Sequence, residues 1–237
     1  MRTESFGPLR VHLTGGTDRE GGGSGPLVVL LHGFGAPGTD LVGLWRVLRA
    51  PRGVRFAFPE APIDLGPAYA GGRAWWRIDV AALERALQRG ELRDLSRSEP
   101  EGLAEARRAL IAALDAMLAA LQVPVGRLVL GGFSQGAMLS LDVALRTAIP
   151  MAGLCLMSGT FLCEHEWRPR MPARAGLPVV LSHGRQDPLL PFALAERLRD
   201  ALHDAGLDVR FVPFHGVHEI PPIVLDEVGR LLEGVLG

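Results

Sequence analysis

Short apolar runs alternate with segments of helical periodicity along most of this 237-residue chain. Several runs are apolar on consecutive residues, which is typical of parallel strands covered on both faces. The pattern predicts strands at Leu27–Leu31, Val54–Phe58, Arg127–Leu130, Ala152–Met157, Pro178–Ser182 and Val209–Phe214. The run Leu9–Leu13 alternates more, and we expect an edge hairpin with Leu27–Leu31 whose mobile tip is the GGGSG at 21–25.

The clearest helical periodicity runs from Leu103 to Leu121, where one stripe of apolar residues precedes the breaker Val123-Pro124. The stripe consists of Leu103, Leu110, Leu114, Met117 and Leu121. Shorter helices are expected at 40–48, 136–146, 191–205 and 222–236. Strands that alternate with helices are joined by right-handed crossovers, so the pattern predicts a mostly parallel, doubly wound α/β sheet with helices on both faces.

We expect residues 1–237 to form one domain, because no internal repeat or linker divides the chain. Residues 63–100 are the least regular stretch of their size. They are interpreted as an excursion over the end of the sheet at which such folds bind ligands. Within them, 80–100 is compatible with a short helix over the site.

Composition and charge narrow the class of protein. The net charge of −1 gives no reason to expect nucleic acid or an acidic membrane surface as a partner. All 25 basic residues are Arg, and Lys and Asn are absent, which we interpret as codon bias in a GC-rich bacterial genome. No apolar run approaches the roughly 20 residues that span a bilayer, and the start of the chain lacks the features of a signal peptide. We therefore expect a cytoplasmic protein without stable membrane insertion.

The stretch LVVLLHGFGAPGTDL, residues 28–42, supports two interpretations. Gly33, Gly35 and Gly38 spell G-x-G-x-x-G after an apolar run, as in a dinucleotide-binding turn. The same letters contain His32-Gly33-Phe34, an arrangement in which backbone N–H groups face a reacting carbonyl oxygen. The first interpretation predicts a bound nicotinamide or flavin, and the second predicts no cofactor.

Gly132–Gly136 reads GFSQG, a G-x-S-x-G at the junction of an apolar strand and a helix. The chain must turn there so sharply that the residues two before and two after the serine crowd each other, and glycine is favoured at both. The turn raises the Ser134 hydroxyl above the sheet and directs the N-terminus of the next helix toward it. Ser134 is therefore a candidate nucleophile.

A serine nucleophile needs a base and an acid that orients the base. In α/β hydrolases the three follow the chain order serine, acid, histidine. Asp187 follows an apolar strand in VVLSHGRQDPLL, and His218 follows the last strand in FVPFHGVHEIP. Both positions lie at the carboxyl ends of strands, the same edge of the sheet as Ser134.

Other residues compete for these roles. His215 shares the loop of His218, but Gly216 gives that loop a turn and 219–221 begins the next helix directly after His218. Asp142 falls in a helix interior and points away from the site. His183 is interpreted as a packing or loop-bracing residue, and Asp208 as a turn residue before its strand. The cysteines, Cys155 and Cys163, match no metal or redox spacing, and Cys155 lies in an apolar run typical of the core.

Three motifs resemble those of the phospholipase/carboxylesterase family of α/β hydrolases, which includes acyl-protein thioesterases and small bacterial carboxylesterases. They are GFSQGA at 132–137, HGRQDPLLP at 183–191 and GVHEIP at 216–221, while the segments at 30–41, 58–62 and 71–79 resemble the oxyanion loop, the following strand end and the aromatic segment. The resemblance implies an α/β-hydrolase fold with little or no cap domain.

Carried over to this chain, the resemblance implies that Ser134 is the nucleophile, His218 the base and Asp187 its orienting acid. The backbone N–H groups of Phe34 and Gln135 would form the oxyanion hole, with neither a metal nor an organic cofactor. The dinucleotide interpretation is disfavoured, since the acid it needs, Glu60, stands between prolines.

The implied activity is that of a serine carboxylesterase acting on small to medium acyl esters through an acyl-enzyme. Two alternatives stay open: an acyl thioesterase or lysophospholipase for long acyl chains, and a non-catalytic binding module with this fold. The expected partner is a small-molecule ester or thioester. Trp75 and Trp76 are adjacent, so on an extended segment only one can line a substrate pocket. Two alternatives stay open: one of them contacts an acyl chain, or both pack in the core. A homodimer through Ile220–Val224 or the tryptophans also stays open.

Overall fold

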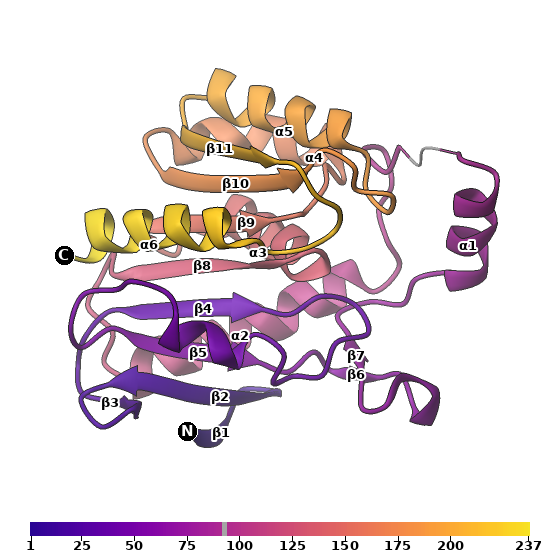
Figure 1. Cartoon of the computed structure of the whole chain (residues 1–237). Coiled ribbons are helices and arrows are strands. Elements are labelled where there is room, and N and C mark those ends of the chain that lie inside the picture. Colours follow the sequence, from indigo (N-terminus) through magenta and orange to yellow (C-terminus); the bar gives the residue numbers. More distant parts are fainter. Residues whose placement is uncertain (92–93) are drawn as a thin grey trace.

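The computed structural model describes residues 1–91 and 94–237. In this part of the chain the main element is a nine-stranded sheet in the order β1-β2-β5-β4-β8-β9-β10-β11, with β3 beside β2 (Figure 1). The antiparallel edge consists of β1 (Arg2–Phe6) and β2 (Leu9–Gly16), and the short β3 (Glu20–Gly22) pairs parallel with β2. The parallel strands are β5 (Arg55–Pro59), β4 (Leu27–Leu31), β8 (Leu128–Phe133), β9 (Gly153–Met157), β10 (Pro178–Gly184) and β11 (Asp208–Phe214).

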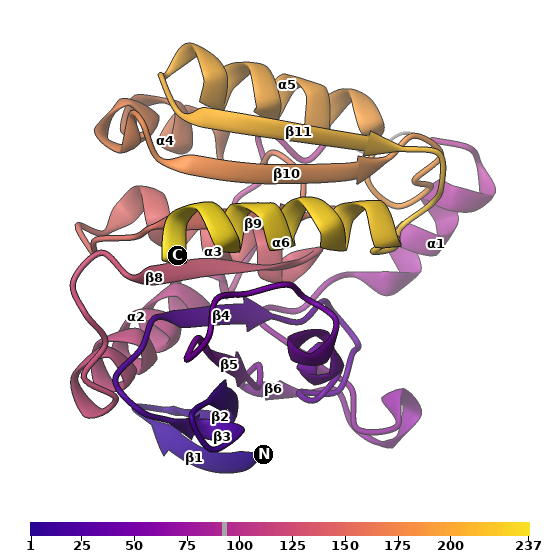
Figure 2. The ribbon, with the colours of Figure 1, turned by 60° about the vertical axis from the view of Figure 1, so that its left-hand side comes forward.

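Helices cover both faces of this sheet (Figure 2). One face packs against α2 (Leu103–Ala120), α3 (Gln135–Arg146), α5 (Phe192–Asp204) and the short α4 (Glu164–Trp167) with η3 (Arg168–Arg174). The other face packs against α6 (Pro222–Leu236) and the 3₁₀ turn η1 (Val42–Arg46). Every residue of β4 is buried, with Val29 in one core and Val28 in the other. The predicted mostly parallel sheet with two covered faces is confirmed.

The six strands expected from apolar runs all form, with small shifts at their ends. The predicted helices at 136–146, 191–205 and 222–236 correspond to α3, α5 and α6. The stripe on α2 is buried, from Leu103 at 1% exposure to Leu121 at 9%. The segment 40–48 is shorter than expected, since only η1 is helical there. Across the described residues, no helix has both the length and the apolar composition of a membrane span.

The expected hairpin between Leu9–Leu13 and Leu27–Leu31 is wrong. β2 pairs with β1 on one side and with β5 on the other, while β4 lies between β5 and β8. Because β2 has only two edges, its pairing with β1 and β5 leaves none for β4.

The glycine-rich stretch at 21–25 is not a free hairpin tip. Its first residues belong to β3, and the guanidinium of Arg55 donates to the carbonyl oxygens of Gly23, at 2.8 Å, and of Gly25. Arg55 is fully buried, and it donates also to the carbonyl of Leu121. A charge buried in this way requires its acceptors, so the side chain fixes the loop.

The excursion at 63–100 lies beyond the carboxyl ends of the parallel strands (Figure 1). It contains a small hairpin of β6 (Ile63–Asp64) and β7 (Arg73–Ala74), the 3₁₀ turn η2 (Pro67–Tyr69) and α1 (Val80–Gln88). Asp79 caps α1 by accepting a hydrogen bond from the backbone N–H of Ala82 at 2.8 Å. The expected helix within 80–100 therefore forms over nine residues, and positions 92–93 of that stretch lie outside the described residues.

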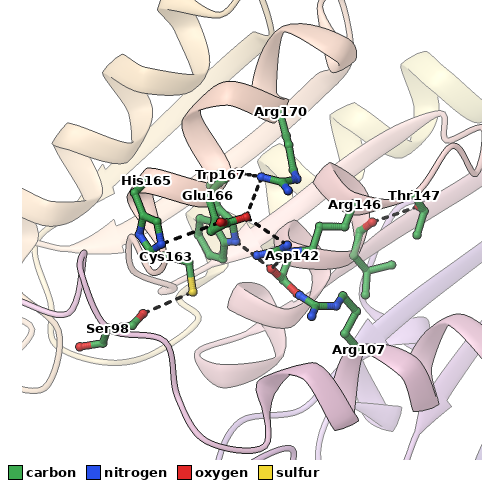
Figure 3. Close-up of polar contacts among 11 residues, drawn as sticks. Ser98, Arg107, Asp142, Arg146, Thr147, Cys163, His165, Glu166, Trp167 and Arg170 are labelled. Atoms are coloured by element: carbon green, nitrogen blue, oxygen red, sulfur yellow. Dashed lines mark hydrogen bonds and ion pairs between the residues drawn. The ribbon is translucent and has the colours of Figure 1, made fainter.

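A buried carboxylate joins three of the helices (Figure 3). Asp142 on α3 accepts hydrogen bonds from Arg107 on α2 at 2.8 Å, from Arg146 at 2.9 Å and from the Trp167 indole on α4 at 2.8 Å. Asp142 therefore lies in the interior of α3, as the sequence predicts.

The residues beside α4 also hold the end of the excursion. The backbone N–H groups of Cys163 and Glu164 donate to the carbonyls of Ser98 and Ser96 at 3.1 and 2.8 Å. The Cys163 thiol donates to the Ser98 carbonyl as well (Figure 3). The Asp142 cluster thus supports α4, and the segment 96–98 is hydrogen-bonded to the start of that helix.

Replacing Asp142 by Asn should destabilise the fold. The amide keeps the shape but takes the anion away from Arg107 and leaves Arg146 with its longer contact to Glu166 at 3.4 Å. Breaking such a partly buried ion pair costs about 3 kcal/mol. Urea unfolding measures the loss. Asp115→Asn on the exposed side of α2 is the matched control, with an expected change within about 0.5 kcal/mol. Equal effects of the two substitutions would contradict the role of Asp142.

Candidate active site

Ser134 occupies a strained turn between β8 and α3. Its backbone has φ 55° and ψ −117°, a left-handed conformation that non-glycine residues rarely adopt. A Cβ added to Gly132 would lie 2.8 Å from the carbonyl carbon of Gly136, and one added to Gly136 would collide with the carbonyl of Leu31. Glycine is therefore required at both positions. The Ser134 N–H donates to the carbonyl of Met157 at 2.8 Å, which fixes the turn.

Asp187 and His218 meet at the same edge of the sheet. Asp187 lies in the loop after β10, and His218 in the loop between β11 and α6. His218 Nδ1 is 2.6 Å from Asp187 Oδ2. Because a carboxylate oxygen only accepts, Nδ1 carries the hydrogen, and Nε2 is left as the basic nitrogen of the ring.

The environment of Asp187 keeps it ionised. Burial raises the pKa of this carboxyl, but hydrogen bonds from His183 and His218 outweigh that effect and hold the pKa far below its usual range. The other carboxylate oxygen, Oδ1, accepts the backbone N–H groups of Leu189 at 2.9 Å and Leu190 at 3.0 Å. The anion beside His218 is therefore present at every physiological pH.

Ser134 and His218 line one cavity of about 370 Å³, together with Phe34 and Gln135. The ring of Phe133 lies beside the His218 imidazole, with 4.8 Å between centroids. Most of the lining is apolar and comes from several separate segments: Phe34, Trp76, Ile78, Leu83, Leu95, Phe133, Met138, Leu162, Leu189 and Leu190. The cavity therefore suits an apolar ligand with its polar end at Ser134.

His32 fixes one peptide of the loop that passes Ser134. The backbone N–H of Ala61 donates to His32 Nε2 at 3.1 Å, so Nδ1 carries the hydrogen and donates to the carbonyl of Gly33 at 2.8 Å. In a trans peptide the N–H points opposite to the C=O, so the Phe34 N–H is directed away from the His32 ring. A Cβ built on Gly33 would lie 3.4 Å from Ser134 Cβ, which places this peptide against the serine.

The β6–β7 hairpin holds the same loop from its other side. The N–H of Gly35 donates to the carbonyl of Arg73 at 2.9 Å, and the N–H of Arg73 donates to the carbonyl of Ala36 at 3.0 Å. These two backbone hydrogen bonds tie the loop to β7. Donors that are fixed before a reaction stabilise developing charge without reorganisation.

Gln135 joins this loop region to the cavity wall. It is the first residue of α3, so its N–H has no partner within the helix. Its buried side chain accepts from the N–H of Trp75 at 2.9 Å and donates to the carbonyl of Trp76 at 2.8 Å. Trp76 lines the cavity, whereas Trp75 packs against the ring of His32 and donates from its indole to the His32 carbonyl at 3.0 Å.

The other candidates for the triad and for a cofactor site are exposed, bonded elsewhere or unreactive. His215 is exposed, and Asp208 is an exposed residue at the start of β11. Glu60, the acid that a dinucleotide site would need, bonds to His12 Nε2 at 2.8 Å. Burial raises the pKa of Cys155 to about 12 and that of Cys163 to about 11, so neither thiol is a ready nucleophile. No cluster of three metal-ligating side chains occurs within 1–91 and 94–237.

Comparison with protein families gives a match to the phospholipase/carboxylesterase family over residues 22–235. The chain belongs to this family. It is therefore a hydrolase of the carboxylesterase and thioesterase class, and the resemblance seen in its motifs is confirmed.

Curated relatives and solved structures agree with this assignment. The chain is 31% identical to acyl-protein thioesterase 1 of Eremothecium gossypii, over 84% of this chain and 83% of the relative. It is 27% identical to acyl-protein thioesterase 1 of Neurospora crassa, over 80% and 78%. The crystal structure of esterase PE8 superposes with a TM-score of 0.75 at 28% identity, covering 96% of this chain and 99% of that one. The carboxylesterase of Bacillus cereus, at 16% identity and a TM-score of 0.69, shares the fold.

The sequence does not reveal the side-chain roles of His32 and Gln135, whereas the loop-bracing role expected of His183 agrees with its hydrogen bond to the Leu190 carbonyl. His32 was named only as part of its motif, and Gln135 only for its backbone N–H. One signal was available, because a histidine directly before the glycine of an oxyanion loop is well placed to bond the next carbonyl. The partners of Gln135 are about 60 residues away in sequence and become visible only in the fold.

The pH dependence of stability should report the buried neutral state of His32. Burial lowers the pKa of this imidazole in the folded state, while the unfolded chain takes up a proton near pH 6.5. The stability that His32 contributes is therefore fully present above that pH and is lost as the pH falls through the folded-state pKa. The difference in unfolding free energy between wild type and His32→Gln should shrink from about pH 7.5 to about pH 5.

Urea titrations at several pH values measure this difference. His203→Gln, at a largely exposed site, is the control and should leave the pH dependence of the wild type unchanged. A difference for His32→Gln that stays constant with pH would mean that His32 is not held neutral by the fold.

Proposed function

We propose that the chain is a serine carboxylesterase that hydrolyses small to medium acyl esters, with Ser134 as nucleophile, His218 as base and Asp187 as the acid that orients the base. The observation that carries the proposal is the 2.6 Å hydrogen bond between Asp187 and a histidine whose ring borders the same cavity as the strained serine turn. This is the arrangement that activates a serine hydroxyl at neutral pH.

In the first step, His218 Nε2 takes the proton of the Ser134 hydroxyl as its oxygen attacks the carbonyl carbon of the ester. The imidazolium that forms is stabilised by the Asp187 carboxylate. It then gives its proton to the leaving alcohol, and an acyl-enzyme remains. Water repeats these steps, with His218 again acting as base, and releases the acid.

The charge on the tetrahedral oxygen is held by the backbone N–H groups of Phe34 and Gln135. The hydrogen bond from His32 to the Gly33 carbonyl supports the orientation of the first donor, and the start of α3 supplies the second. Removing one donor from such a site costs about 10²–10³ in rate. Substitutions of the Phe34 side chain are expected to matter less than changes in the loop backbone.

The cavity of about 370 Å³ supports an apolar acyl group beside Ser134. Trp76 and Leu83 of α1 supply apolar wall, while Asp40, Arg77 and Asp79 add charged groups to the lining. This composition favours an ester with an apolar acyl group over a fully polar substrate.

A thioesterase activity is the second candidate. The support is the similarity to the two fungal proteins named acyl-protein thioesterase 1, with identities of 27% and 31%. The same serine chemistry cleaves thioesters, so the two activities differ in the leaving group and in the acyl chain, as does a lysophospholipase activity. The membership in a hydrolase family argues against a non-catalytic binding module.

Compartment, source and assembly are proposals from the sequence. The arginine-only basic residues favour a bacterial source, although the two relatives named above are fungal, and a cytoplasmic location stays a proposal. Trp75 and Trp76 are buried and offer no surface for a dimer. Ile223, at 53% exposure, is the residue in the 220–224 segment on which a dimer contact could form.

Labelling with a fluorophosphonate tests the nucleophile. We expect wild type to be labelled and to hydrolyse p-nitrophenyl esters, and Ser134→Ala to lose both, with a loss in kcat of about 10⁶-fold. Ser140→Ala, at a buried serine of the following helix, is the control and should keep its labelling. A folded wild-type protein that is not labelled would refute the assignment of Ser134.

Leu83→Trp should shift the acyl-chain preference toward shorter esters. The larger ring fills part of the cavity, so kcat/KM for the longest accepted ester should fall about tenfold relative to the acetate. The measurement is a series of p-nitrophenyl esters of increasing chain length. Leu87→Trp, on the exposed part of the same helix, is the matched control. An unchanged profile would place the acyl chain away from α1.

A further inference from the structure

A second histidine contacts the carboxylate of Asp187. His183 is the sixth residue of β10, and its side chain is completely buried. Its Nε2 lies 2.8 Å from the carbonyl oxygen of Leu190 and 3.3 Å from Asp187 Oδ2, the same oxygen that receives His218 Nδ1. The mechanism proposed above makes no use of this ring.

The contacts determine which nitrogen of His183 carries hydrogen. Both neighbours of Nε2 are oxygen acceptors, so Nε2 must be the donor. The other nitrogen, Nδ1, is buried and has no hydrogen-bond partner. A hydrogen on Nδ1 would be a buried donor without an acceptor, so the hydrogen lies on Nε2.

This one donor links both halves of the acid loop. Leu190 donates its N–H to Asp187 Oδ1 while its carbonyl accepts from His183, and the His183 hydrogen is shared with Oδ2. The carboxylate is thus held by two backbone N–H groups and two imidazole N–H groups. Because β10 is paired with β9 on one side and β11 on the other, His183 is held by the sheet, and rotation of the carboxylate would break several of these bonds at once.

We propose that His183 is a positioning residue of the reaction, which fixes the Asp187 carboxylate so that its Oδ2 points at His218 Nδ1. The inference rests on the proposed function, in which Asp187 orients the base. His183 touches no substrate; it acts through Asp187. A displacement of about 1 Å in a catalytic group costs up to about 10²-fold in rate. A residue that fixes the Asp187 carboxylate therefore affects the rate without touching the substrate.

The remaining surroundings of His183 do not offer another role for the ring. It contacts the edge of Phe192 on α5, with 6.2 Å between centroids, and the guanidinium of Arg185 covers the Phe192 ring at 4.8 Å. The charged and titratable groups near His183 are therefore Asp187, His218 beyond it, and Arg185 behind an aromatic ring. The His183 ring makes its hydrogen bonds through Nε2, to Leu190 and Asp187, whereas its contact with Phe192 is aromatic packing.

The experiment compares His183→Phe with His183→Gln. Phenylalanine fills the buried space without a donor, whereas the Gln amide carries an N–H at a reach similar to that of Nε2. Rates are expressed per active site titrated by the p-nitrophenol burst, so that loss of folded protein does not affect kcat. Ser182→Ala, at the neighbouring buried residue of β10, is the matched control.

We expect His183→Phe to lower kcat about tenfold or more with KM changed by less than about twofold, and His183→Gln to restore most of the loss. The Phe variant should also move the acid-side midpoint of the kcat/KM profile to higher pH, because a carboxylate with one donor fewer attracts the proton on His218 more strongly.

A double-mutant cycle with Asp187→Asn separates this inference from the proposed function. If His183 acts through Asp187, His183→Phe should cost less than about twofold in the Asp187→Asn background. Additive losses, or a Phe variant with normal kcat per titrated site and a normal pH profile, would overturn the positioning role and leave the proposed function intact. Full activity of Asp187→Asn itself would refute the proposed function.

Discussion

The close approach of the Ser134 turn to the end of β4 is the constraint on which the rest of the site depends. Gly136 packs so tightly on the carbonyl of Leu31 that a single added carbon would collide with it. Leu31 is directly followed by His32 and Gly33, the start of the loop that carries the Phe34 N–H. The missing side chains at Gly132 and Gly136 therefore set the distance between the serine and the loop opposite it.

Buried polar side chains around this contact are hydrogen-bonded to backbone groups of the segments packed against them. His32 connects the end of β4 with Ala61 after β5, and Gln135 connects the start of α3 with the segment of Trp75 and Trp76. The bonds to Ala61, Trp75 and Trp76 join segments that are 29 to 60 residues apart in sequence. Since an unpaired polar group in such a place costs free energy, the bonds hold the loops in a single arrangement.

The excursion at 63–100 has two distinct tasks. Its first part, the β6–β7 hairpin, pairs with the loop at Gly35 and stiffens it. Its last part supplies Leu95 and Ser98 to the cavity and is held against α4 by backbone bonds to Cys163 and Glu164, next to the Asp142 cluster. The wall of the cavity and the backbone donors near Ser134 are thus supported by different parts of the same excursion.

The sequence by itself determined the six parallel strands, the main helices and the candidates Ser134, Asp187 and His218, which the fold brings to one edge of the sheet. Apolar runs and turn glycines are local signals, and the carboxyl ends of parallel strands meet at the same edge whatever the details of packing. Only the tertiary structure decided the partner strands of β2, the fixed glycine loop beside Arg55 and the bonds of His32, Gln135 and His183. Those depend on which distant groups meet in the folded chain, and no local pattern in the sequence encodes such a meeting.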